Sequence, residues 1–240
     1  MSIAVGPDVI EDGLVLCLDA GDRNSYAGSG STWYDLSGNG NNGTLVNNPT
    51  FNSNNGGSFG FDGTNDYVTI NANNGFDFGS SDFTIQLWCY DLNGGPIISN
   101  GDNGSWTTGG WSIDEFGNDT ADFFIHRFLY IKSNGTLFST NIYVHKNRWS
   151  HITICKNNNN VFFYLDGSLE TTASSPGNLA AYTGTNDLSI GSRRSGGSGL
   201  GSYILYQEGQ IPSILIYKNK TLSAQEIRQN FNATKGRFGL

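Results

Sequence analysis

Short segments in which two kinds of side chain alternate recur along the whole chain, and they constrain its fold more than any other feature. In the clearest one, residues 82–90 (DFTIQLWCY), Phe83, Ile85, Leu87 and Cys89 share one face of a strand and the intervening residues share the other. Both faces carry large groups, so we expect this strand in a sheet whose second face is also covered or used. Gly, Asn and Asp separate nearly all of these segments, which predicts an all-β sandwich, jelly roll or barrel.

Two tight reversals are encoded in the second half of the chain. The run NNNN at residues 157–160 connects HITICK to VFFYLDG, and Asp166-Gly167 ends the second of these segments. Asn, Asp and Gly adopt the left-handed backbone angles that tight hairpins require. We therefore expect a hairpin region here.

One stretch near the C-terminus, TLSAQEIRQNF, has the features of a helix. Ser223 is a favourable N-cap, and Glu226 three residues later completes a capping box. Leu222 and Ile227 occupy the two positions of a hydrophobic staple. These signals predict a short helix over residues 224–231, with its apolar side docked on the sandwich.

The length of 240 residues suits one domain, which we expect over residues 13–240 after an N-terminal arm of residues 1–12. The formal net charge is −8, and no cluster of basic residues beyond Arg193-Arg194 offsets it. Such a chain repels nucleic-acid phosphates on average. No apolar run is long enough to span a membrane. Because of the charge, we expect no nucleic-acid partner, and because of the missing apolar run, we expect no membrane partner.

The three cysteines, Cys17, Cys89 and Cys155, each lie in an apolar, strand-like segment. An odd number in such settings predicts buried free thiols and a reducing compartment. The N-terminal sequence MSIAVGPDVIEDG has neither the basic nor the apolar region of a signal peptide, so we expect no secretion signal.

Several segments follow one another in an order typical of a known family: WYDLSGNGNNGTL, GFDGTNDYVTI, DFTIQLWCY, RWSHITICK, VFFYLDGSLETT, LSIGS and ILIYKNKTLSAQEI. They resemble the laminin-G-like domains of the concanavalin A-like lectin/glucanase superfamily. The resemblance covers nearly the whole chain and implies a two-sheet antiparallel jelly-roll sandwich. The opening, EDGLVLCLDAGDRNSYAGSGSTWYDLSGNGNNGTL, also resembles a subgroup found in tailed-phage genomes, which implies a virion protein made in the host cytoplasm.

Glucanases of that superfamily carry two carboxylates two residues apart on one strand, where both point to the same face. None of the 21 acidic residues here is paired with another at that spacing. Asp114 and Glu115 come nearest, but neighbours on a strand point to opposite faces. Because glycoside hydrolysis needs a carboxylate pair with different pKa values, we expect no enzymatic activity. A hydrolase whose carboxylates come from different strands stays open as an alternative.

Residues 35–40 (DLSGNG) begin like a calcium-binding EF-hand loop, but Val46 stands where the bidentate Glu is required. Asn and Gly tolerate positive φ, so residues 37–43 (SGNGNNG) are better explained as a chain reversal made of left-handed turns. Trp33 and Leu45 are expected to anchor its ends.

A second calcium site is implied by the resemblance alone. Many relatives carry an acidic residue after the Ile of the last strand, where it assists a metal. Here Pro212 and Ser213 replace that residue, which puts the site in doubt. Asp19 and Asp62 remain as candidate ligands for Ca²⁺.

Carbohydrate binding needs an aromatic face for the sugar ring and polar groups for its hydroxyls. The stretch NGSWTTGGWS presents Trp106 and Trp111 among Gly, Ser and Thr, and Arg127, Arg193 and Arg194 add hydrogen-bond donors. Trp and Arg are equally the favoured anchors of protein interfaces, and Trp111 is also explained as a core residue because it begins a strand-like segment.

Two functions follow from these observations. The first is a non-catalytic virion protein, on the capsid surface or in the tail or fibre, that docks on other virion proteins as a homo-oligomer. The alternative is a lectin-like adhesin that recognises glycans of the host surface.

Overall fold

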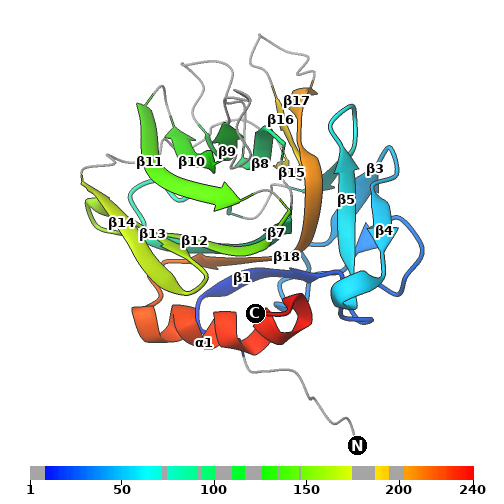
Figure 1. Cartoon of the computed structure of the whole chain (residues 1–240), viewed down its shortest axis with the longest axis horizontal. Coiled ribbons are helices and arrows are strands. Elements are labelled where there is room, and N and C mark those ends of the chain that lie inside the picture. The colour runs from blue at the N-terminus through cyan, green and yellow to red at the C-terminus, as the bar shows by residue number, and fades with distance from the viewer. Residues whose placement is uncertain are drawn as a thin grey trace, which may run out of the picture.

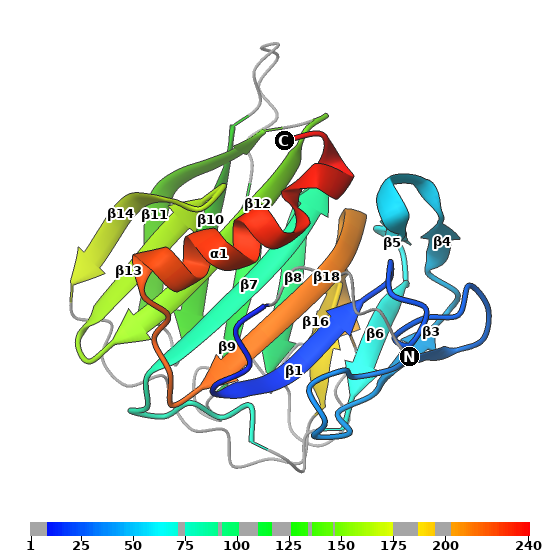
Figure 2. The ribbon, with the colours of Figure 1, turned by 90° about the horizontal axis from the view of Figure 1, so that it is seen from below.

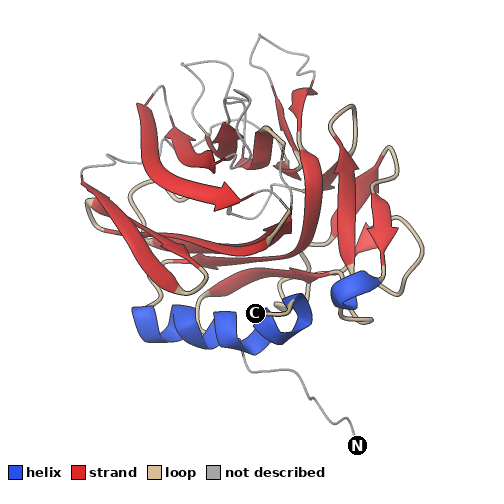
Figure 3. Cartoon of the chain, in the orientation of Figure 1, coloured by secondary structure: helices blue, strands red, loops and turns tan. Residues whose placement is uncertain are grey.

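The structure is a computed structural model, and strands make up most of it (Figure 3). It describes residues 9–71, 75–90, 93–100, 110–116, 126–133, 136–145, 147–174, 187–194 and 203–240. Its helices are α1 (Ala224–Thr234) and two short 3-10 segments, η1 (Asn54–Gly56) and η2 (Lys235–Phe238). Within these ranges, no helix has the length and apolar character needed to cross a membrane.

Two eight-stranded sheets form a sandwich (Figure 1). In spatial order, the first sheet consists of β14 (Ser168–Ser174), β13 (Asn160–Leu165), β12 (Trp149–Asn157), β7 (Phe83–Tyr90), β18 (Glu208–Lys218), β5 (Ser58–Asp62) and β4 (Thr50–Asn52), and β1 (Leu14–Asp19) also pairs with β18. The second sheet consists of β11 (Thr136–His145), β10 (His126–Ser133), β9 (Trp111–Phe116), β8 (Gly95–Asn100), β15 (Leu188–Ile190), β6 (Tyr67–Ile70), β3 (Gly43–Val46) and β2 (Thr32–Trp33). A separate hairpin contains β16 (Ser192–Arg194) and β17 (Tyr203–Tyr206).

All strand pairings among the described residues are antiparallel. Together with α1, the one α-helix in the part of the chain that the structure describes, they confirm the predicted all-β, two-sheet antiparallel sandwich.

The core lies between the two sheets, and β7 shows how alternation builds it. Phe83, Ile85 and Leu87 are at most 1% exposed and belong to the same buried cluster as Ile190 of the second sheet. Trp88 points to the other face of β7 and is also buried, at 1% exposure, because α1 and η2 cover that face. The expectation that both faces of this strand are covered is therefore confirmed.

The helix α1 lies across β13, β12 and β7 (Figure 2). Ser223 accepts a hydrogen bond from the Glu226 amide, and the Glu226 side chain accepts one from the Ser223 amide, so the predicted capping box is present. The helix continues to Thr234, three residues beyond the predicted end, where the indole of Trp88 donates to the Thr234 hydroxyl at 2.8 Å. This bond ties the last turn of the helix to the sheet.

The predicted hairpin region is confirmed. β12 and β13 pair up to Asn157 and Asn160, and Asn158 between them has a φ of 52°. Asp166 and Gly167, with φ of 50° and 76°, then turn the chain into β14. Positive φ at these positions is what their residue types tolerate.

The three cysteines are free thiols, as predicted. Cys89 and Cys155 are buried, and Cys17 is partly buried. Burial raises the pKa of Cys155 to about 12, and burial together with nearby carboxylates, first Asp19, raises the pKa of Cys17 to about 12. These thiols therefore stay protonated near neutral pH.

Candidate functional site

A row of hydroxyl side chains crosses the outer face of the second sheet, which points away from the core. Neighbours within each strand point to the core, so the hydroxyls between them must point outward. Strand pairing aligns one such residue from each of β9, β8, β15, β6, β3 and β2. This hydroxyl row consists of Ser112, Ser99, Ser189, Thr69, Thr44 and Thr32.

The two ends of the hydroxyl row differ in exposure. Its three serines are at most 2% exposed. β16 covers two of them, since the Ser99 hydroxyl donates to the Ser192 carbonyl at 2.9 Å and the Ser189 and Ser192 hydroxyls hydrogen-bond to each other. At the opposite end, Thr44 is exposed and its neighbours in the row are partly exposed. A ligand that reaches the row therefore meets the threonine end.

Arg193 of β16 forms an ion pair with Asp114 of β9 beside the serine end of the row. Its Nη1 lies 2.7 Å from the Asp114 Oδ2, and the two side chains are 14% and 2% exposed. A charged hydrogen bond so shielded from water fixes both groups in place. The pair fastens the β16–β17 hairpin to the second sheet.

Glu115 lies on the opposite side of β9 from Asp114. It is 1% exposed, and its Oε2 accepts a hydrogen bond from the Gly94 amide at 2.6 Å. After burial, its charge is the largest cause that raises the pKa of the core thiol Cys89 well above the ordinary value. The two carboxylates therefore point to different faces, as predicted, and do not form the pair that glycoside hydrolysis requires.

The structure places one of the remaining predicted binding residues in the core and leaves the side chains of the others undescribed. Trp111 is 0% exposed and its indole donates to the Phe76 carbonyl at 2.7 Å, so the explanation as a core residue holds and its ring offers no face to a ligand. Trp106 lies outside the described residues. Arg127 and Arg194 lie on β10 and β16, but their side chains are outside the description.

The hydroxyl row was not anticipated, although the sequence carries a signal for it. Single Ser or Thr residues stand between apolar residues in WSI (111–113), LSI (188–190) and VTI (68–70). Alternation predicts that each hydroxyl leaves the core, but only strand order and register align them.

Asp35 organises the loop that follows β2. Its Oδ1 accepts the backbone amides of Cys17 and Ser37, each at 2.9 Å. Its Oδ2 accepts the Asn41 amide at 2.9 Å and the Ser37 hydroxyl at 2.7 Å. Both oxygens are filled by N–H and O–H donors, so the structure supports the chain reversal over a calcium loop.

The same loop protects the outer edge of β1. Besides the bond to Asp35, the side-chain amides of Asn39 and Asn41 donate to the carbonyls of Leu14 and Val15, at 3.2 and 2.8 Å. Unpaired strand edges invite association with other chains. The asparagines of this segment thus occupy groups that would otherwise stay open to another strand.

Asp19 and Asp62, the candidate calcium ligands, already accept hydrogen bonds from other groups of the chain. Arg237 Nη1 lies 2.9 and 2.7 Å from the two Asp19 oxygens, and a guanidinium at that place repels a cation. The Asp62 Oδ1 accepts the amides of Thr64 and Asn65, and these bonds, Thr64 first, lower the pKa of Asp62. Nowhere among the described residues do three His, Cys, Asp or Glu side chains converge, so these positions do not fit calcium.

Comparison with known proteins places this geometry in a family. A laminin G model, described as the concanavalin A-like lectin/glucanases superfamily, matches residues 62–228. No curated protein matches the sequence at a significant level.

Solved structures resemble the chain at low sequence identity, which shows the fold alone. Domain 4 of AbnA, an extracellular arabinanase from Geobacillus stearothermophilus, in complex with arabinotriose, is 13% identical with a TM-score of 0.62, over 91% of this chain and 98% of that one. The binding domain of Paraclostridial Mosquitocidal Protein 1 is 19% identical with a TM-score of 0.63, over 92% of this chain. The binding domain of botulinum neurotoxin DC in complex with SialylT is 19% identical with a TM-score of 0.64, over 93% of this chain. The chain spans about half the length of these two toxin domains, 52% in each case.

Proposed function

The chain belongs to the concanavalin A-like lectin/glucanase superfamily, and from that membership we propose that it is a non-catalytic binding domain that recognises a carbohydrate. The hydroxyl row carries this proposal. Hydroxyl groups both donate and accept hydrogen bonds, which suits the hydroxyls of a sugar. Among the structural neighbours, the arabinanase domain with arabinotriose and the toxin domain with SialylT are in keeping with it.

The ligand would approach the threonine end of the row, where Thr44 is exposed. Trp106, Arg127 and Arg194 stay in the proposal by residue type alone, as an aromatic face for a sugar ring and donors for its hydroxyls. Arg193 would act by holding the hairpin against the sheet, because its guanidinium already bonds to Asp114.

The absence of catalysis is proposed from the placement of Asp114 and Glu115. A general acid must release a proton to the leaving group, while a second carboxylate acts across the same cleft. Asp114 accepts a charged hydrogen bond from Arg193, and Glu115 lies on the core side of β9.

Binding to a broad glycan array, followed by calorimetric titration with arabinotriose and with any array hit, tests the proposal. Thr44→Ala should weaken binding about fivefold, the effect of one lost hydrogen bond of about 1 kcal/mol. Thr172→Ala is the matched control, because Thr172 is an exposed threonine on β14 of the first sheet. Trp106→Ala should weaken binding without a change in melting temperature. Silence across the array and with arabinotriose would overturn the proposal.

A second candidate is docking on other virion proteins as a homo-oligomer, which the phage-like opening segment favours. The last part of the N-terminal arm is bonded to the fold: the Ile10 amide donates to the Asn230 side chain at 2.9 Å, and the Tyr217 hydroxyl donates to the Ile10 carbonyl at 2.8 Å. A truncation of residues 1–8 therefore leaves these bonds in place. The truncated protein should fold with an unchanged melting temperature and fail to enter particles; normal incorporation would argue against a docking role for the arm.

A further inference from the structure

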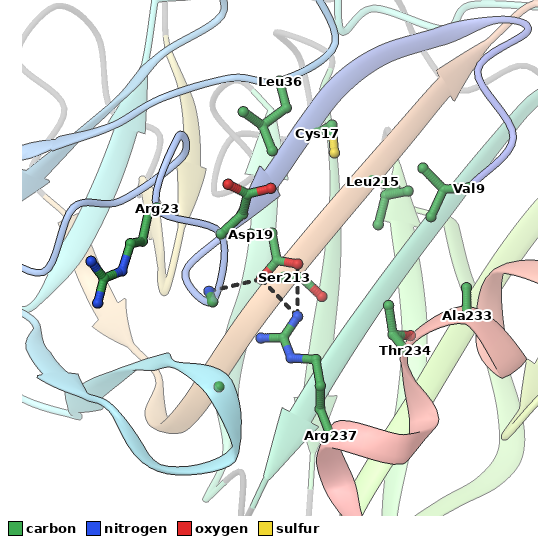
Figure 4. Close-up of a pocket in the computed structure, with 13 residues that line it drawn as sticks. Val9, Cys17, Asp19, Arg23, Leu36, Ser213, Leu215, Ala233, Thr234 and Arg237 are labelled. Carbon is green, nitrogen blue, oxygen red and sulfur yellow. Dashed lines mark hydrogen bonds and ion pairs between the residues drawn. The ribbon is translucent and has the colours of Figure 1, made fainter. Parts of the chain in front are cut away.

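A groove of about 910 Å³ lies on the helix side of the first sheet (Figure 4), and the hydroxyl row lies on the opposite face of the sandwich. One wall is the end of α1 with η2, and the other is formed by the turn after β1 and the loop after β2. This volume falls within the range of about 300–1,000 Å³ that is usual for sites of small ligands.

Two aligned residue pairs from β1 and β18 form the floor of the groove. Cys17 lies opposite Leu215, and Asp19 lies opposite Ser213. Residues paired in this way project to the same face of a sheet. The floor is therefore divided into an apolar half and a polar half.

The walls repeat this division. Leu36 and Val9 line the apolar end, while Arg23 and Arg237 line the polar end, as Figure 4 shows. A ligand that fills the groove must therefore combine an aliphatic part with a polar head.

The Ser213 hydroxyl is the feature that indicates a ligand at the polar end of the groove. Ser213 is 2% exposed, and its Oγ has no hydrogen-bond partner among the described residues. Buried hydroxyls almost always have a partner, and leaving one without costs stability. A hydroxyl group of a ligand on the floor of the groove would supply the missing bond.

The charges at the polar end indicate that the head is neutral. Asp19, Asp22, Arg23 and Arg237 are the charged residues that line the groove, and their charges sum to zero. Asp19 and Arg237 already neutralise each other through two short contacts of 2.9 and 2.7 Å. A charged head, whether anionic or cationic, would be attracted by some of these residues and repelled by the neighbouring residues that carry its own sign.

We propose that this groove is a second ligand site, which takes an uncharged polyhydroxylated head joined to a short aliphatic chain. The head occupies the polar half and bonds to Ser213, and the chain lies between Leu215 and Leu36. The proposal does not depend on carbohydrate recognition at the hydroxyl row, because the two surfaces lie on opposite faces of the sandwich.

The test uses the full chain and n-octyl β-D-glucoside below its micelle-forming concentration, followed by NMR spectra of the backbone amides. Saturable shifts are expected for residues around the groove, such as Gly21 and Leu36. Glucose alone and 1-octanol alone, which carry only the head or only the chain, should bind at least tenfold more weakly. Absence of saturable shifts at the groove would overturn the proposal, and so would equal binding of either half.

Ser213→Ala identifies the polar contact. It removes a hydroxyl that has no partner among the described residues, so the variant should fold as well as the parent, and it should bind octyl glucoside about fivefold more weakly. Ser150→Ala is the matched control, because the Ser150 hydroxyl is equally buried and without a partner among the described residues but does not line the groove. Unchanged affinity in Ser213→Ala, or an equal loss in both variants, would contradict the assignment.

Discussion

Asn230 on the buried side of α1 donates its side-chain amide to the side-chain Oε1 of Gln86 on β7 at 2.6 Å. The same amide donates to the Tyr217 hydroxyl at 2.9 Å, and the Asn230 Oδ1 accepts the Ile10 amide. One side chain of the helix thus joins β7, β18 and the segment before β1. The two bonds donated by the Asn230 amide are buried, and the bond from Ile10 is partly buried.

Asn230→Ala should lower the free energy of unfolding by about 2–4 kcal/mol, because it leaves several buried polar groups without their partner. Urea unfolding followed by circular dichroism measures the change. Gln225→Ala, on the exposed side of the same helix, is the control and should stay within about 0.5 kcal/mol of the parent. Equal stabilities of the two variants would show that the Asn230 bonds contribute little.

His151 should make the protein sensitive to acid. It is 2% exposed and packed against Trp88 and Phe231, and burial lowers its pKa from 6.5 to about 3. Since the folded state disfavours the protonated ring, its contribution to stability is complete above pH 6.5 and is lost as the pH falls toward 3. The loss approaches about 1.4 kcal/mol per pH unit within that window.

The comparison of His151→Phe with the parent isolates this effect, because a phenyl ring fits among the same aromatic side chains and does not titrate. Urea unfolding at several pH values between 7 and 4 should give a shallower decline for the variant. Parallel declines in the two proteins would assign the acid sensitivity to carboxylates instead.

Asp35→Ala should both destabilise the fold and promote association. The change removes four hydrogen bonds: one joins the 34–41 loop to Cys17 of β1, and three hold the loop in its own shape. A loss of about 2 kcal/mol is expected for partly exposed bonds of this number, and the edge of β1 becomes available to another strand. Urea unfolding and light scattering at increasing protein concentration measure the two effects. Asn24→Ala, in the neighbouring exposed turn, should change neither.

Local features of this fold are predictable from the sequence, and distant contacts are not. The Ser223 capping box and the Asp166-Gly167 turn depend on residues within four positions of one another, so their geometry follows from residue type. The pairing of Asp19 with Arg237 joins residues 218 positions apart. The contact between them depends on which strand pairs with β18 and on where α1 ends. Neither of these can be predicted from the alternation of side chains along a strand.

The candidate site divides in the same way. Alternation correctly sends Asp114 and Glu115 to opposite faces, because it depends only on the strand period. Alternation does not decide whether Trp111 is a core or a binding residue, since a tryptophan at the start of a strand suits a core and a binding face equally well. Only the contact with a distant segment, the Phe76 carbonyl between β6 and β7, settles this position as core.

Removal of one partner of the ion pair between Arg193 and Asp114 should destabilise the fold strongly, and removal of both partners should cost less than the sum of the two single losses. Arg193→Met removes the guanidinium from a carboxylate that is 2% exposed, and the expected loss of stability is about 3 kcal/mol. In Arg193→Met combined with Asp114→Asn, no carboxylate charge remains at this place, so the loss should be smaller than the sum of the two single losses. Thermal unfolding of the parent, both single variants and the double variant completes the cycle. Additive losses would mean that the hairpin is held to the second sheet by its other contacts, such as the Ser99 bond to Ser192, and that the charge pair itself contributes nothing.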